Sequence, residues 1–168
     1  MTANHLPAGK SSSHIAESIA LCELQHPIIH RGLHYWEQLR QQREVPARSD
    51  ISPRALAPLL ANITLVKVIG EGDDFELRIA GDAVTRAFRF PVHGQRLSRL
   101  SALVPKISHL LRRQYREVVR TRTPQGWRYT IDDSVEVVTF TGAEYLMLPL
   151  SEDGQTIDHV LGVTGFLR

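Results

Sequence analysis

One stretch in the first third of the chain constrains the fold most, because a helical pattern there gives way to a polar turn. Leu33, Trp36 and Leu39 recur at the spacing that places side chains on one face of a helix. Pro27 suits the first turn of such a helix, and the pattern extends to about Gln42. An isolated helix of this length is marginal in water, so it needs a surface on which to bury its apolar stripe.

The polar turn ends in a second helix signal. Residues 46–53 begin and end with proline, and Ser52 is suited to cap a helix whose first position is Pro53. This pattern predicts a short helix over residues 54–60, ahead of the first strand.

The N-terminal residues contain one more expected helix. Ser13 can cap a helix that runs to about Gln25 and carries Ile15, Ile19 and Cys22 on one stripe. The residues before it are polar and hold no apolar run that could be a signal peptide or a membrane span. We therefore expect a disordered tail there.

Strands are predicted from apolar patterning in two groups. Residues 63–69 form a nearly continuous apolar run, which is typical of a strand covered on both sides. After a turn, Phe75, Leu77 and Ile79 alternate on one face of a returning strand that Gly81 ends. Alternation resumes over residues 127–131, 135–140, 144–150 and 159–167.

Helical patterns separate these two groups of strands. Residues 82–90 are expected to form a short helix, followed by a break at residues 91–94. The longest helix is expected over residues 103–122. Its apolar positions are Leu103, Ile107, Leu110, Leu111, Val118 and Val119. Strands, helices and further antiparallel strands in this order predict an α+β domain.

These residues also carry a resemblance to a known family. The chain reads Tyr-Trp at residues 35–36, Pro-x-Arg-x-Asp-Ile-x-Pro at 46–53 and Phe-x-Leu-Arg-Ile-Ala-Gly at 75–81. In this order, and with Gly94, the motifs resemble a family of stand-alone bacterial PAS-like proteins over residues 31–167. The resemblance implies a PAS-like five-stranded antiparallel sheet with helices on one face, preceded by N-terminal helices.

The resemblance divides the chain into a disordered tail (1–13), N-terminal helices (14–43) and a PAS-like domain (44–168). It marks as framework the positions Trp36, Pro46, Arg48, Asp50, Pro53, Arg78, Gly81 and Gly94. We interpret Gly81 and Gly94 as sites of positive φ or close approach by a helix. Arg78 could pair with an acid on a neighbouring strand.

The function that the resemblance implies is that of a cytoplasmic sensory or signalling adaptor without an attached effector. It would bind a small molecule, a protein partner or both. The expected ligand cleft is lined by Phe88, Phe90, Leu110, Trp127 and Tyr129. A ligand-free protein-interaction module and a small-molecule enzyme that uses the cleft are the alternatives.

A homodimer is the expected assembly. PAS domains commonly pair through helices that precede the sheet, and the stripe of Ile15, Ile19 and Cys22 could meet its own copy across a two-fold axis. Cys22 is the only cysteine, so no internal disulfide is possible, as is usual in the cytoplasm.

Charge is segregated along the chain. Residues 83–131 carry eleven Lys and Arg against one acid, whereas residues 132–168 carry seven acids and one base. On the longest helix, a positive face for an anionic partner is formed by Arg112, Arg113, Arg116 and Arg120. The alternative is a solvated helix face. No helix-turn-helix, zinc finger or RNA-binding aromatic motif supports direct DNA binding.

The metal and cofactor patterns are weak. His26, His30 and His34 share the spacing of a helical face that could hold zinc, but we favour polar positions beside the Trp36 stripe. The haem ligand of some PAS domains lies on the equivalent of the longest helix, where His109 falls on the polar side. No cysteine follows the second strand, which argues against a flavin photoadduct.

No catalytic set is visible. Ser101, Ser108 and Ser134 lack a nucleophile-elbow context, no phosphate-binding glycine loop is present, and Asp132-Asp133 is typical of a turn. We therefore expect a protein that is not an enzyme.

Overall fold

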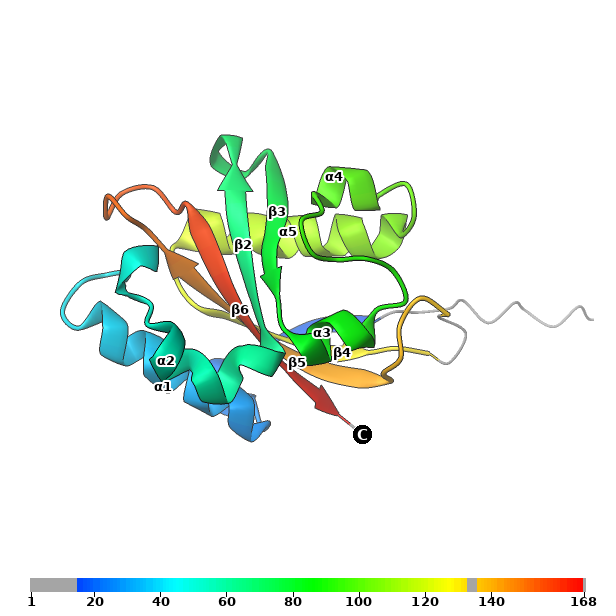
Figure 1. The fold of residues 1–168 in the computed structure, drawn as a ribbon, viewed down its shortest axis with the longest axis horizontal. Helices are drawn as coiled ribbons and strands as arrows, with labels where there is room; N and C mark the ends of the chain where they lie inside the picture. The colour runs from blue at the N-terminus through cyan, green and yellow to red at the C-terminus, as the bar shows by residue number, and fades with distance from the viewer. Residues whose placement is uncertain (1–14, 133–135, 168) are drawn as a thin grey trace, which may run out of the picture.

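The computed structural model describes residues 15–132 and 136–167, which form an α+β fold around one antiparallel sheet (Figure 1). Its six strands lie in the order β1-β4-β5-β6-β2-β3. They are β1 (Ile15–Ile19), β2 (Ile63–Ile69), β3 (Asp74–Ala80), β4 (Gln125–Thr130), β5 (Gly142–Leu150) and β6 (His159–Leu167). The predicted α+β class is confirmed, with six strands in place of five. The tail predicted over residues 1–13 lies outside the described residues.

The additional strand, β1, forms where the first helix was predicted. The helix expected from Ser13 to Gln25 is wrong, because β1 pairs with β4 from Ile15↔Thr130 to Ile19↔Gly126. Only a short 3-10 turn, η1 (Leu21–Glu23), follows. Apolar residues four positions apart fit both a helical stripe and one side of a strand, so the open edge of β4 decided between the two.

This correction removes the helix on which the homodimer prediction rested. Ile19 packs against the core of its own chain, and Cys22 is exposed. The side chain of Ile15 lies outside the described residues. The three residues therefore do not form a helical stripe that a second copy could meet.

Helices cover both faces of the sheet. They are α1 (Pro27–Arg40), α2 (Pro53–Leu56), α3 (Asp82–Ala87), α4 (Leu97–Leu100) and α5 (Pro105–Thr121), with 3-10 turns η2 (Arg48–Asp50), η3 (Ala57–Asn62) and η4 (Gly70–Gly72). Figure 1 shows α5 running behind β2 and β3, while η3, which follows α2, contacts α1.

Neighbouring residues of β5 identify the two faces. Leu146 pairs with Val163 of β6, whose side chain lies against Gly32 of α1. Tyr145, next in sequence, faces the other way and contacts Tyr115 of α5. The N-terminal helix α1, whose docking surface the sequence left open, therefore covers the face opposite α5.

The α1 face is closely packed. A Cβ at Gly32 would lie 2.7 Å from Cγ2 of Val163, so only glycine lets the helix come this near. Trp36 is 2% exposed, and its Nε1 donates to the carbonyl of Pro149 at 2.8 Å. Of the predicted stripe, Trp36 is thus buried, whereas Leu33 and Leu39 are half-buried.

A bulge turns the end of β3. Leu77 pairs with Val66, but Ile79 pairs with Leu65, so Arg78 is the extra residue. Because Leu65 and Val66 face opposite sides, Ile79 leaves the face of Leu77 and is 43% exposed. The prediction that Ile79 shares this face with Phe75 and Leu77 was therefore wrong.

The turn between Pro46 and Pro53 begins at a buried residue and ends at the N-cap of α2. Pro46 is buried, Arg48 is exposed, and Asp50 accepts hydrogen bonds from the Ala47 amide at 2.8 Å and from Arg43 at 2.6 Å. The predicted helix start is confirmed, since the Ser52 hydroxyl accepts from the amide of Ala55 and α2 begins at Pro53. The helix soon continues as the 3-10 turn η3.

The remaining framework positions lie at the rim of β3. Gly81 has a negative φ, but a Cβ there would overlap the carbonyl of Leu60, so it serves close approach. Gly94 has a φ of 72°. Arg78 pairs with Glu76 of its own strand at 3.1 Å, whereas an acid on a neighbouring strand was the expected partner.

The strand predicted over residues 135–140 is not formed by its described part. Residues 136–140 form one isolated bridge, Phe88↔Val138.

Candidate functional site

A cavity of about 100 Å³ lies between α5 and the sheet. The helix contributes Ile107, Leu110 and Leu111 to its wall. The opposite wall is the face of the sheet that carries Tyr129 and Tyr145. The remaining side is lined by Val84 of α3, by Phe88 and by Val138 and Phe140.

Hydroxyl groups form the main polar feature of this cavity. Tyr145 lies between two partners, with its hydroxyl 2.6 Å from that of Tyr115 and 2.9 Å from Oγ1 of Thr64. All three side chains are buried. Burial raises the pKa of Tyr115 well above its ordinary value, and it raises the pKa of Tyr145 despite the hydrogen bonds from Thr64 and Tyr115. The cluster is therefore uncharged at neutral pH.

A second polar contact joins β4 to α5. Tyr129 donates its hydroxyl proton to Oε1 of Gln114 at 2.5 Å, and Gln114 is fully buried. Among the described residues, Nε2 of Gln114 and Nε1 of Trp127 have no hydrogen-bond acceptor. Burial also raises the pKa of Tyr129 well above its ordinary value. Buried donors without a partner are rare in folded proteins, and two of them lie on this side of the sheet.

Three of the five residues predicted for the cleft line this cavity. Phe88, Leu110 and Tyr129 do so. Phe90 lines an adjoining space of about 30 Å³ beside Phe88. Trp127 is buried on the same face but is not part of the lining.

Sequence reasoning missed the hydroxyl cluster. Thr64 and Tyr145 are polar residues within largely apolar strands, which is a detectable signal, because a buried polar group needs a partner. Which partner it finds depends on strand register and on how α5 lies across the sheet.

The arginine face of α5 is divided between two roles. Arg112 donates to the carbonyl of Asp73 at 2.7 Å, and Arg116 donates to that of Gly72 at 3.0 Å, so both hold the turn between β2 and β3. Arg120 pairs with Glu117 at 2.6 Å. Arg113 is exposed and has no partner among the described residues.

The histidines lie at the surface or at a helix end. His26 caps α1 by accepting from the amide of Ile28 at 3.2 Å, and His30 and His34 are exposed. His109 is exposed on α5. Within residues 15–132 and 136–167, no three His, Cys, Asp or Glu side chains form a metal-binding group, and no helix could cross a membrane.

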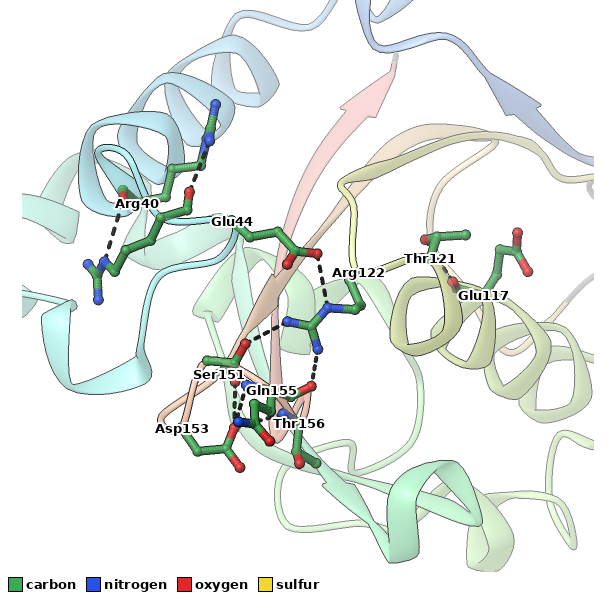
Figure 2. Close-up of polar contacts among 11 residues, drawn as sticks. Arg40, Glu44, Glu117, Thr121, Arg122, Ser151, Asp153, Gln155 and Thr156 are labelled. Carbon is green, nitrogen blue, oxygen red and sulfur yellow. Dashed lines mark hydrogen bonds and ion pairs between the residues drawn. The ribbon is translucent and has the colours of Figure 1, made fainter.

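Arg122 ties the cavity helix to two loops (Figure 2). It ends α5 in the left-handed conformation, with a φ of 58°. Its Nε donates to Glu44 at 3.0 Å, and its other nitrogens donate to the carbonyls of Gly154, at 2.8 Å, and Gln155. Through this one side chain, α5 contacts both the loop after α1 and the loop after β5.

Asp153 shapes the second of these loops. Its carboxylate accepts from the amides of Thr156 and Gln155 and from the hydroxyl of Ser151, as Figure 2 shows. These hydrogen bonds, first those from the amides, lower the pKa of Asp153 to about 2. The loop therefore presents its carbonyls to Arg122 over the whole physiological pH range.

Comparison with known proteins shows the family. The family described as "PAS domain" matches residues 24–165. The chain belongs to the PAS domain family. The match begins after β1, which therefore lies outside the matched residues. No curated protein and no solved structure matches the chain.

Proposed function

We propose that this PAS domain is a cytoplasmic sensor that binds a small molecule in the cavity under α5 and reports occupancy to a protein partner. The observation that carries the proposal is the cavity itself. Close-packed interiors leave few voids larger than a water molecule, and this void adjoins a cluster of hydroxyl groups.

A route for the signal is available at Arg122. A ligand can shift a protein only through its different affinities for two conformations. Because α5 forms one wall of the cavity, a ligand that favours a slightly displaced α5 also displaces the guanidinium group bonded to Glu44 and Gly154. The loops at these residues are the surface on which a partner would read the change.

Native mass spectrometry of the purified protein tests the proposal. We expect a non-covalent mass on the wild type that is lost on denaturation. Leu110→Phe fills the cavity and should reduce the fraction of protein that carries this extra mass. Leu103→Phe, at a side chain that is 67% exposed, should leave that fraction unchanged. A wild-type spectrum that shows the polypeptide alone would overturn the proposal in favour of a ligand-free interaction module.

A further inference from the structure

The described lining of the cavity has no charged side chain. Its seventeen residues are aliphatic or aromatic except for hydroxyls of threonine and tyrosine. An anion or cation placed there would lose its hydration without gaining an opposite charge, which is costly in an apolar surrounding. The lining therefore selects against ionised ligands such as phosphates and carboxylates.

The hydroxyl cluster has one proton more than its two close hydrogen bonds use. Thr64, Tyr115 and Tyr145 carry three hydroxyl protons, and two hydrogen bonds join them. Whichever way these two bonds run, the third proton has only the longer contact between Thr64 and Tyr115 within the cluster. A buried donor with so weak a contact is stabilised by a molecule that brings an oxygen to it.

Tyr129 adds the complementary function. Because its proton goes to Gln114, its oxygen is left with lone pairs that can accept a hydrogen bond at the cavity wall. A ligand with a hydroxyl group can thus accept at one point and donate at another.

We infer that the cavity takes one uncharged molecule, about the size of a single six-membered ring, that carries a single hydroxyl or carbonyl oxygen. An apolar cavity of roughly 150 Å³ holds a benzene molecule, and this one measures about 100 Å³ with an adjoining space of about 30 Å³. The inference rests on the proposed function, since it names the chemistry of the molecule bound at the same site.

Three fluorinated probes of one ring size test this ligand class by ¹⁹F NMR titration of the full chain at neutral pH. They are 4-fluorophenol, fluorobenzene and 4-fluorobenzoate. We expect 4-fluorophenol to bind about fivefold to tenfold more tightly than fluorobenzene, as one extra hydrogen bond would give. The anionic 4-fluorobenzoate should not bind.

A matched variant assigns the preference to the cluster. Replacing its three hydroxyls together (Thr64→Val, Tyr115→Phe, Tyr145→Phe) keeps the shape of the cavity and removes the spare donor. The advantage of 4-fluorophenol over fluorobenzene should shrink at least threefold, while fluorobenzene binds as before. The wild-type comparison among the three probes stands even if this variant fails to fold.

The outcomes separate the two proposals. Equal binding of 4-fluorophenol and fluorobenzene, or any binding of 4-fluorobenzoate, would overturn the ligand class and leave the sensor proposal in place. If no probe binds but a copurified mass is present, the ligand class alone is wrong. If no probe binds and the protein purifies without added mass, both proposals are wrong.

Discussion

The two faces of the sheet differ in how completely they are filled. On the α1 face, Gly32 lies against Val163 and the Trp36 indole has its carbonyl acceptor. On the α5 face, a cavity remains and the buried donors of Gln114 and Trp127 have no acceptor among the described residues. The α1 face is therefore closely packed with its donor satisfied, whereas the α5 face keeps a cavity and unpaired donors. The α5 face is the one able to bind a ligand.

The largest expected effect on stability concerns the closely packed α1 face. Trp36→Ala removes a buried indole and its hydrogen bond to Pro149, and it should lower the free energy of unfolding by about 3–5 kcal/mol. Urea denaturation measures the loss, with the exposed Leu103→Ala as a control. Equal stability of Trp36→Ala and the wild type would break the comparison, because the α1 face would then not be the stabilising layer.

Glu144 provides the next effect on the same face. Its side chain is 1% exposed, and it accepts from the amides of Gln25 and His26 and from Arg128, each at 2.8 Å. Glu144→Gln weakens these contacts and should cost about 1–3 kcal/mol in urea denaturation. A change below 0.5 kcal/mol, as is usual for surface positions, would contradict a structural role.

The pH dependence follows from the same contacts. Burial by itself raises the pKa of Glu144, but the hydrogen bonds from Arg128 and the two amides outweigh it and hold the pKa below its ordinary value. The stabilisation is therefore complete above the ordinary glutamate pKa and is lost as pH falls through the lower, folded-state value. In acid denaturation, Glu144→Gln should lack this part of the decline.

Arg122 links α5 on one face of the sheet to the loop after α1 on the other, so its removal tests whether the two faces are coupled. Arg122→Gln loses the contacts to Glu44, Gly154 and Gln155 and should cost about 1–2 kcal/mol. Arg120→Gln, which removes only an exposed pair on the same helix, is the matched control. In hydrogen exchange, saturating 4-fluorophenol should change protection near Glu44 in the wild type and in Arg120→Gln but not in Arg122→Gln. The same response in all three would show that the signal leaves elsewhere.

The smallest effects concern the outer side of α5. Replacing Arg112 and Arg116 by Gln should cost about 1 kcal/mol, because the turn between β2 and β3 loses its donors. The matched pair of changes at Arg113 and Arg120 should stay within about 0.5 kcal/mol. Thermal unfolding in parallel decides, and equal losses in the two double variants would mean that the face behaves as one solvated surface.

Local signals in the sequence predicted what depends on neighbouring residues. Ser52 and Pro53 start α2 as expected, and β6 has the predicted bounds, because caps and alternation act over a few residues. The family, too, followed from the order of short motifs.

Features that need distant residues escaped prediction. Ile15 and Ile19 fit two periods, and only the unpaired edge of β4 selects the strand. The bulge at Arg78 depends on pairing with β2. Most of the polar chemistry of the cavity was missed for the same reason, since the contact of Tyr115 with Tyr145 requires α5 to lie across the assembled sheet.

The added strand has a consequence for biosynthesis. β1 leaves the ribosome before its partner β4, which is made roughly a hundred residues later. At about 5–20 residues per second, the N-terminal segment waits on the order of 5–20 s for its partner. During that interval a β1 strand from a second nascent copy would meet the same edge in the same register. Crowded polysomes are thus the setting in which exchange of this strand between chains is most favoured.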